Sequence, residues 1–402
     1  MTTALLALLL LTSLPFRNDT TAQTSSVRDN FIFWTDSHVI SNGRKAPEMM
    51  NPILSGMKNP KVFFGGDCMP ARGKDIETAY NIQKSLVGRI LPEAKVFCLR
   101  GNHDFYYRDS DDRTKGRTLS REETSKLLEA EMRGGFVKNP EDKGANYFYY
   151  DEPSARIRYI AFDTNDKSVG CDKPMQTVEG VGAQQLDWIV REAIGGAPDN
   201  YSFVFLMHIP IAFPYDTRHG KVIEEIDKVA ETGRLLAVFC GHNHHDFQIY
   251  RHGAFWISTV SDAYYSNGSR TPYPVKDCRH RKGGPDEQAF DKVSINNNVI
   301  TCKRSGYGSD RIFHMEKHEV KAGRNLRLRS SLGPDAMWTI YDALTPKFVR
   351  GKNYSGHWEL TNDIATLSGK KGTFRALSQG EAVAVAISAD TTKIEVFPIS
   401  VR

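Results

Sequence analysis

The residues of this chain whose types could do chemistry are carboxylates, imidazoles and one amide that follow five short apolar runs. Such side chains offer oxygen and nitrogen ligands, which suit Zn, Mn or Fe better than a soft metal. Two divalent ions about 3.5–4 Å apart need a bridging anion, and a carboxylate is the natural one. The set therefore indicates a centre with two metal ions, and its members are Asp36, His38, Asp67, Asn102, His103, His208, His242 and His244.

The stretch 96–104 shows how the chain could position such residues. It begins as an apolar run, which predicts a short buried strand, and becomes polar at Gly101. A glycine there lets the chain turn sharply and approach another group closely. In open α/β sheets, ligands bind at the carboxyl ends of the strands. A lone histidine is more often a core or surface residue, so the signal is the recurrence of the pattern at five strand ends.

Strand and helix candidates alternate up to about residue 240. This alternation predicts βαβ units in a layered α/β core. We expect strands at 31–35, 62–64, the first half of 96–104, 147–150, 158–162, 203–207 and 235–240, and helices at 46–57, 75–91, 182–194 and 222–231.

A long polar insertion, residues 105–144, interrupts this alternation. Its Ser-Arg-Glu-Glu at 120–123 fits a capping box, so a helix is expected to run from there to about Arg133. The insertion could be a substrate lid or a solvated excursion. Tyr106 and Arg108 could contact a phosphate group, or could be a packing tyrosine and a solvated charge.

The chain changes character after about residue 255, where short strand candidates replace the alternation. From about Val320 these segments are separated by turn signals, which predicts a small all-β domain. We expect the boundary within 316–323, which divides the chain into 28–318 and 322–402.

Composition and the N-terminus bear on partners and compartment. The net charge of +5 is too weak to indicate nucleic-acid binding and would suit an anionic substrate. The apolar run in 1–14 is too short to span a bilayer and is typical of a signal peptide within 1–23, although no Lys or Arg precedes it. We therefore expect an exported bacterial protein, periplasmic or extracellular, without a transmembrane segment. The alternative is a buried N-terminal helix.

The cysteines suggest core residues and one possible disulfide. Cys68, Cys98 and Cys240 lie in or beside apolar runs and are expected in the core. Cys278 and Cys302 flank a polar loop and could be bridged in an oxidising compartment. The sequence has no Cys-x-x-Cys, so a thiolate zinc site is not expected.

Five blocks of this chain resemble, in order, those of the calcineurin-like metallophosphoesterases over residues 28–318. These blocks are Asp36-x-His38, Gly66-Asp67, Gly101-Asn102-His103-Asp104, His208 and Gly241-His242-Asn243-His244. The resemblance implies a four-layer α/β/β/α sandwich of two β-sheets flanked by helices. It implies one metal ion at Asp36, His38, Asp67 and His244, and a second at Asp67, Asn102, His208 and His242. It also implies that His103 faces the leaving group while Asp104 orients its ring.

The chemistry that this resemblance implies is hydrolysis of a phosphate ester, by a monoesterase or a diesterase. Two ions lower the pKa of a water between them and neutralise charge on the phosphoryl oxygens. A protonated His103 could donate to the leaving oxygen. Purple acid phosphatases carry a tyrosine three positions after the bridging aspartate, where this chain has Pro70, so a charge-transfer iron site is not expected. We expect an anionic phosphoester substrate, either a small molecule or a lipid.

Residues 362–389 resemble the group 2 bacterial immunoglobulin-like domain. The similarity lies in Ala-Thr-Leu-Ser-Gly at 365–369, Gly-Thr-Phe-Arg-Ala-Leu at 372–377 and Gly-Glu-Ala-Val-Ala-Val at 380–385. It implies an Ig-like β-sandwich and an exported context. It also leaves a second function open, that of a non-catalytic, exported, metal-containing binding protein that uses this β domain.

Overall fold

The structure is a computed structural model that describes residues 27–38, 45–69, 72–73, 76–109, 116–166, 180–212, 220–262, 271–273, 287–350, 356–369 and 371–402. Side chains are not described at 72–73, 76–79, 106–109, 116–117 and 350. The expected signal peptide and Cys278 lie outside these ranges. Across the described residues, no helix has the length and apolar character needed to cross a membrane.

The first large sheet joins strands from the two ends of the chain. Its order is β19-β24-β25-β16-β15-β14-β1-β2-β4, and β17 pairs with β25. β1, β2 and β4 run parallel, whereas β14 pairs antiparallel with β1. The strands are β1 (Asp29–Trp34), β2 (Lys61–Phe64), β4 (Lys95–Cys98), β14 (Ala289–Ile295), β15 (Val299–Gly306), β16 (Asp310–His314), β17 (His318–Val320), β19 (Met337–Asp342), β24 (Gly380–Ile387) and β25 (Lys393–Val401).

The second large sheet comes from the middle of the chain, in the order β12-β13-β11-β10-β9-β8-β7. Its central strands β9, β10, β11 and β13 are parallel. The five strands that precede the candidate ligands are therefore divided between two sheets, β1, β2 and β4 in the first and β10 and β11 in the second. The strands are β7 (Val137–Lys138), β8 (Phe148–Glu152), β9 (Ile157–Phe162), β10 (Ser202–Met207), β11 (Leu235–Cys240), β12 (Phe247–Arg251) and β13 (Ala254–Ser258).

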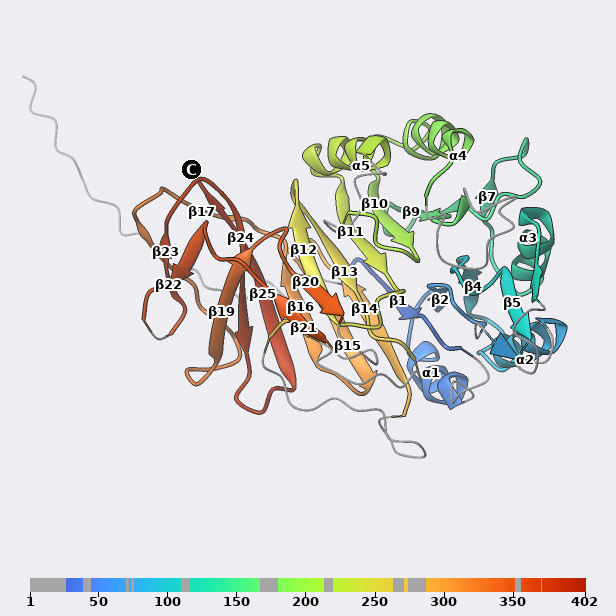
Figure 1. Cartoon of the computed structure of the whole chain (residues 1–402), viewed down its shortest axis with the longest axis horizontal. Helices are drawn as coiled ribbons and strands as arrows, with labels where there is room; N and C mark the ends of the chain where they lie inside the picture. The colour runs from blue at the N-terminus through green and yellow to red at the C-terminus, as the bar shows by residue number, and fades with distance from the viewer. Residues whose placement is uncertain are drawn as a thin grey trace, which may run out of the picture.

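The two sheets pack face to face over an aromatic core (Figure 1). Phe31 of β1 meets Phe63 of β2 edge to face, with ring centroids 5.3 Å apart. It meets Tyr159 of β9 and Phe239 of β11 in the same way, at 5.5 Å and 5.4 Å. Each such pair adds about 0.5–1.5 kcal/mol beyond the apolar area that it buries. The expected α/β core is confirmed, and this packing fixes the two sheets against each other beneath the candidate site.

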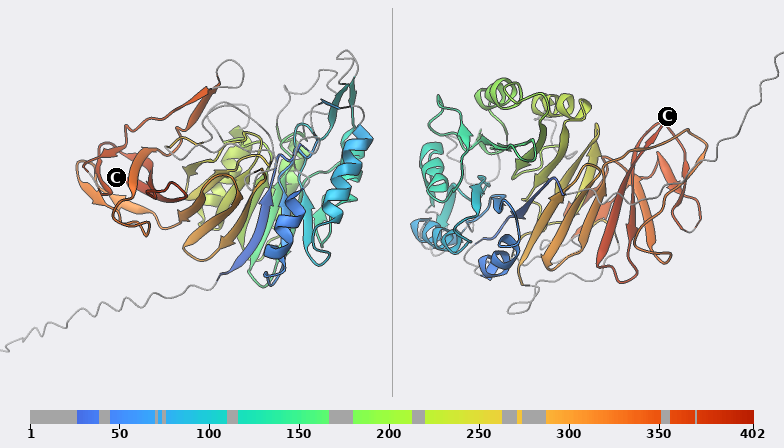
Figure 2. Two further views of the ribbon diagram at one scale, coloured as in Figure 1. Left: turned by 90° about the horizontal axis from the view of Figure 1, so that it is seen from below. Right: turned by 180° about the vertical axis from the view of Figure 1, so that it is seen from behind.

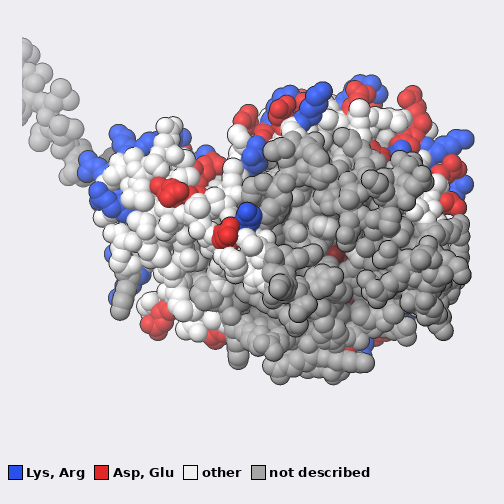
Figure 3. Space-filling view, in the orientation of Figure 1, with Lys and Arg blue, Asp and Glu red and all other residues white. Residues whose placement is uncertain are grey.

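Helices cover the outer face of each sheet and complete four layers. α1 (Ala46–Leu54) and α2 (Ile76–Gly88) pack on the first sheet. α4 (Ala183–Trp188), its π-helical continuation Ile189–Ile194 and α5 (Gly220–Glu231) pack on the second. Figure 3 shows positive and negative side chains mixed along α4 and α5, so no surface of a single charge forms there.

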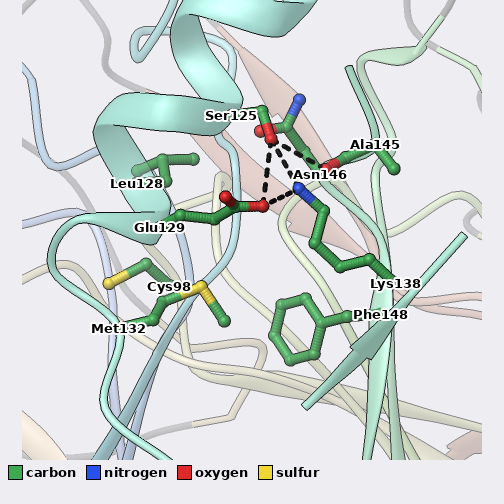
Figure 4. A pocket seen from close by; sticks show the side chains of 9 residues that line it. All are labelled: Cys98, Ser125, Leu128, Glu129, Met132, Lys138, Ala145, Asn146 and Phe148. Atoms are coloured by element: carbon green, nitrogen blue, oxygen red, sulfur yellow. Dashed lines mark hydrogen bonds and ion pairs between the residues drawn. The ribbon is translucent and has the colours of Figure 1, made fainter. Parts of the chain in front are cut away.

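The polar insertion is tied to the core. β3 (Arg72–Gly73), β5 (Tyr106–Asp109) and β6 (Gly116–Thr118) form a small sheet of their own. The expected capping box is confirmed at the start of α3 (Arg121–Glu129), which is shorter than expected because the chain turns after Glu129. Lys138 of β7 donates to Ser125 of α3 at 2.6 Å and pairs with Glu129, as Figure 4 shows at a small cavity. The helical part of the insertion is thus anchored and does not project into solvent.

The strands after β16 continue the first sheet and do not form a sheet apart. β25 pairs in parallel with β16, and β24 and β19 follow it outward. Three further strands make a second layer on this end, with Phe374 and Phe397 in the shared core. They are β18 (Asn325–Arg327), β22 (Ala365–Leu367) and β23 (Thr373–Ala376). The expected all-β character holds, but no break in the sheet marks 316–323, and the division into domains there stays a prediction.

A hairpin, β20 (Lys347–Arg350) and β21 (Gly356–Glu359), extends from the end of β19. It lies in front of the first sheet in Figure 1. In the left view of Figure 2 it rises on the same side of the molecule as β5 and β6. The C-terminal segment therefore reaches over the side of the core where the candidate ligands lie.

The cysteines follow the expectation in part. Cys68, Cys98 and Cys240 are free and buried, as predicted. Cys302 is also free and fully buried on β15, which does not support the possible bridge to Cys278, a residue outside the described ranges. Its side chain packs in the core between the sheets.

Candidate metal centre

The strand ends of the two sheets bring the predicted ligands together. Three groups of ligand atoms each lie within 4.8 Å of one another. Asp67 and His38 each belong to two of them, so the three groups form one continuous site between the sheets. The groups are Asp36, His38 and His244; His38, Asp67 and His103; and Asp67, His208 and His242.

The first group presents two imidazole nitrogens to each other. His38 Nδ1 lies 3.0 Å from the carbonyl oxygen of Met69, which can only accept a hydrogen bond, so His38 Nε2 carries the lone pair of the neutral ring. Burial lowers the pKa of His38 to about 4, which keeps the ring neutral near pH 7. Its Nε2 lies 3.3 Å from Nε2 of His244, which in turn lies 3.0 Å from Oδ1 of Asp36. A cation is the natural partner for such a set.

The group of Asp67, His208 and His242 is built in the same way around His208. Its Nδ1 donates to the carbonyl oxygen of Gly65 at 2.8 Å, which turns Nε2 toward Asp67 Oδ2 at 3.1 Å and Asn102 Oδ1 at 3.2 Å. His242 Nδ1 lies 2.7 Å from the same Asn102 oxygen. Asp67 also accepts the backbone N–H of His103 at 2.8 Å. Because Asp67 shares one group of ligand atoms with His38 and another with His208 and His242, it stands where a bridging ligand would lie.

Buried charge is the main electrostatic feature of this site. Burial opposes ionisation of Asp36, yet its pKa falls to about 2 because His244 and His208 lie close. Burial also lowers the pKa of His208, but the charges of Asp67 and Asp36 outweigh it and raise that pKa to about 10. Burial, with the charge of His208, lowers the pKa of His242 to about 3. Buried carboxylates are paired or coordinate metal ions, so this donor set fits divalent cations.

The backbone at the site is strained. Nine residues other than glycine have positive φ in the described chain, and five of them are candidate ligands. A left-handed conformation costs about 1–2 kcal/mol for such a residue, and it persists only where the surroundings fix it. These five are Asp36 (φ 55°), His38 (40°), Asp67 (55°), His242 (68°) and His244 (59°).

Two glycines allow the loops to approach the carboxylates. A Cβ at Gly101 would lie 2.1 Å from Oδ1 of Asp67, and one at Gly241 would lie 2.6 Å from Oδ2 of Asp36. Neither glycine has positive φ, so close approach is what requires glycine at both positions.

His103 lies at the edge of the site, and Asp104 does not contact its ring. The His103 side chain is 21% exposed, and its Nε2 is 3.8 Å from Oδ2 of Asp67. Among the described residues, its buried Nδ1 has no hydrogen-bond partner. Asp104 accepts the N–H groups of Gly101 at 2.7 Å, Asp67 at 2.9 Å and Met69 at 3.1 Å. The expected role of Asp104 is therefore corrected, because this fully buried carboxylate fixes the Asp67 loop.

The end of β9 carries positioning residues that the sequence analysis missed. Asp163 pairs with Arg100 at 2.7 Å, immediately before Gly101, and Arg100 also donates to the carbonyl oxygen of Asn165. Thr164 accepts the backbone N–H of Ile209, next to His208. The signal was present, since Asp-Thr-Asn-Asp at 163–166 follows an apolar run as the ligand blocks do.

A second buried network holds the loop of His242 and His244. Asp246 pairs with Arg304 at 2.8 Å and Arg311 at 3.2 Å, and Asp291 pairs with the same guanidinium groups at 2.8 Å and 2.7 Å. All four side chains are at most 3% exposed. Burial opposes the ionisation of Asp291, but Arg304 and Arg311 hold the pKa of this carboxyl group well below its usual range.

The candidate substrate residues are only partly placed. Tyr106 and Arg108 lie on β5, which begins directly after the 101–104 block, and their side chains are outside the described part of the structure.

A comparison with known protein families agrees with this site. The family model for calcineurin-like phosphoesterases matches residues 30–246, more than half of the chain, and no curated protein matches. The chain is similar to a dimetal phosphatase from Danio rerio (11% identity, 72% of this chain and 100% of that chain, TM-score 0.49). It is also similar to the phosphopantetheinyl hydrolase PptH from Mycobacterium tuberculosis (12%, 58% and 89%, 0.32) and to GAP50, the anchor in the inner membrane complex of Plasmodium (11%, 68% and 83%, 0.39). On the family match, the chain belongs to the calcineurin-like phosphoesterase family of metal-dependent hydrolases.

Proposed function

We propose that this chain hydrolyses a phosphate ester at a centre of two divalent metal ions, Mn, Zn or Fe. The observation that carries the proposal is that Asp67 stands between two groups of ligand atoms. Bound there, the ions would activate a water and neutralise charge on the phosphoryl group. One ion is assigned to Asp36, His38, Asp67 and His244, and the other to Asp67, Asn102, His208 and His242.

The protein residues hold this centre and supply a proton. Asp104 accepts the backbone N–H of Asp67, and the backbone N–H of His103 donates to Oδ1 of Asp67, so the backbone and the carboxylate of Asp67 are each held. His103 is assigned as the general acid, which donates from Nε2 to the leaving oxygen. Its partial exposure beside Asp67 supports this role. General acids typically contribute about 10²–10⁴-fold to the rate.

The substrate is proposed to be an anionic phosphoester, either a small molecule or a lipid. Tyr106 and Arg108 are assigned as contacts to it, because β5 borders the 101–104 block. An arginine there could hold two phosphate oxygens. Both a monoester and a diester fit this assignment.

The compartment and the C-terminal segment complete the proposal. The apolar run in 1–14 supports export to the periplasm or beyond. The two-layer packing of β18, β22 and β23 on β19, β24 and β25 supports an Ig-like sandwich, one layer of which is shared with the core.

The test is hydrolysis by metal-free protein and by protein reconstituted with Mn²⁺ or Zn²⁺. An aryl phosphate and an aryl phosphodiester are measured in parallel, and their rates assign the substrate class. We expect activity only after reconstitution, and none in the His208→Ala variant. A matched control is His252→Ala. This exposed histidine directly follows the last residue of β12, and its substitution should retain full activity. Full activity of the His208→Ala variant would contradict the proposal.

A further inference from the structure

The loop that carries His242 and His244 is in contact with the C-terminal hairpin. His245 is the residue after His244. The centroid of its ring lies 4.2 Å from the ring centroid of Phe348 on β20 and 5.5 Å from that of Trp358 on β21. Phe348 and Trp358 are paired across the hairpin, with their rings 5.4 Å apart. The hairpin thus presents one aromatic face to the residue that follows the last candidate ligand.

The same face continues past His245. Trp358 lies 4.9 Å from the ring of Phe247, the first residue of β12. Asp246, between His245 and Phe247, is held by Arg304 and Arg311. Each of the three residues that follow His244 therefore contacts a part of the chain that lies after the segment matched by the family model.

The hairpin is firmly attached at its base. Asp342, at the end of β19, accepts the Thr361 hydroxyl at 2.6 Å and the N–H groups of Asp363 at 3.0 Å and Ile364 at 2.9 Å. Beyond this base, β20 and β21 pair only with each other among the described strands. Two-stranded hairpins are marginal by themselves, so the contact with His245 and Phe247 contributes to holding the hairpin in place.

The loop needs such support. His242 and His244 both have left-handed backbones, which last only where the surroundings fix them. Metal ligands also have to be held close to their productive geometry by their neighbours. We propose that hairpin β20–β21 is a positioning element of the metal centre, which acts through Phe348, Trp358 and His245 on His244 and His242. This inference rests on the proposed function, since it concerns the ions assigned there.

The test is Mn²⁺ binding to the full-length, metal-free protein, measured by calorimetry without substrate. The double substitution Phe348→Ala/Trp358→Ala removes the aromatic face. We expect about tenfold weaker binding of one ion, as is typical when support behind a ligand is lost. The control, Val349→Ala/His357→Ala, alters the paired residues on the other face of the hairpin and should bind like wild type. Phe348→Tyr/Trp358→Phe keeps the rings and should restore the affinity.

The outcomes separate this inference from the proposed function. Wild-type affinity in the double-alanine variant overturns the inference, and so does an equal loss in the control. Should the double variant not fold, His245→Ala in an otherwise intact hairpin is expected to show the same tenfold loss, and unchanged affinity there overturns the inference. Wild-type protein that binds no Mn²⁺ would contradict the proposed function itself.

Discussion

The two sheets contribute unlike parts to the candidate metal centre. The loops after β1, β2 and β4 supply both carboxylates, the amide and two imidazoles, whereas the loops after β10 and β11 supply imidazoles only. The first-sheet side therefore brings both carboxylates, and the second-sheet side brings imidazoles alone. The supports differ as well. Asp104 holds the first side from within the same group of loops, while the second side is held by Asp291, Arg304, Arg311 and the hairpin, far along the chain.

This difference teaches that the carboxylate side of the site is held by segments within the first 166 residues, whereas the imidazole loop of His242 and His244 also depends on segments later in the chain. Asp104 holds the Asp67 loop from 37 positions away, and Asp163 pairs with Arg100 beside it, but all of these residues lie within the segment matched by the family model. The His242–His244 loop is fixed by segments that follow the part of the chain matched by the family model. Substitutions on the two sides should accordingly have different consequences.

The largest effect is expected from ligand removal. Asp67→Ala should abolish hydrolysis and the binding of both metal ions, because Asp67 shares one group of ligand atoms with His38 and another with His208 and His242. His244→Ala, on the second-sheet side, should lose one ion and keep the other. Metal content per chain, measured by elemental analysis after Mn²⁺ reconstitution and desalting, checks this. Equal losses in the two variants would remove the distinction between a bridging and a terminal ligand.

His103→Ala is expected to lower kcat by about 10²–10⁴-fold, because it removes the assigned proton donor. Metal content should remain that of wild type, since this ring lies at the edge of the site. Rates with a series of aryl phosphates check the assignment, because the deficit should shrink as the leaving group becomes more acidic. A deficit that is the same for every leaving group would speak against a general acid.

The supports of the two sides can be compared directly. Asp246→Ala leaves buried guanidinium groups short of one partner and should lower the free energy of unfolding by about 3–5 kcal/mol. Asp104→Asn exchanges one acceptor oxygen for a donor among N–H groups and should cost less, about 1–3 kcal/mol. Urea denaturation of both variants measures the two values. A larger loss for Asp104→Asn would reverse the ranking of the two supports.

The smallest effect is the pH dependence of stability, which should have opposite signs on the two sides. Burial and the charge of Asp104 raise the pKa of Glu131, on the first-sheet side, to about 8. The folded protein then keeps a proton that the unfolded chain loses above its ordinary pKa of 4.5, so this contribution is lost as the pH rises toward 8. The lowered pKa of Asp291 stabilises the folded protein above pH 3.8, the ordinary pKa of this group. This stabilisation is lost as the pH falls from 3.8 through the folded-state pKa.

Urea denaturation between pH 3 and pH 9 tests this contrast, because pH 9 lies about one unit above the folded-state pKa of Glu131 and pH 3 lies about one unit below the ordinary pKa of Asp291. Glu131→Gln should flatten the decline of the free energy of unfolding toward alkaline pH and leave the acid limb unchanged. An unchanged alkaline limb in this variant would mean that Glu131 is ionised in the folded protein.

The candidate ligands could be found from the sequence because each follows a strand of ordinary pattern. A buried strand that ends in Gly-Asn-His-Asp or Gly-His-Asn-His is a local signal, and the parallel arrangement then gathers the ends. The same local signal was present at Asp163. It was passed over because an aspartate that pairs with a buried arginine looks like any other polar residue after a strand.

The other features depend on contacts between distant segments, which a single sequence does not reveal. Alternating patterns predicted the strands after Val320 but could not show that β25 pairs with β16. The left-handed backbones of Asp36 and His242 have no residue signature, because glycine is absent from both positions. Asp104 stands next to His103 in the sequence, yet its carboxylate is turned toward the loop of Asp67.

The most direct test of the account is anomalous diffraction from crystals grown with Mn²⁺. We expect two manganese peaks about 3.5–4 Å apart, with the carboxylate of Asp67 between them, His244 at one peak and His208 at the other. A single peak, or two peaks that do not share Asp67, would contradict it.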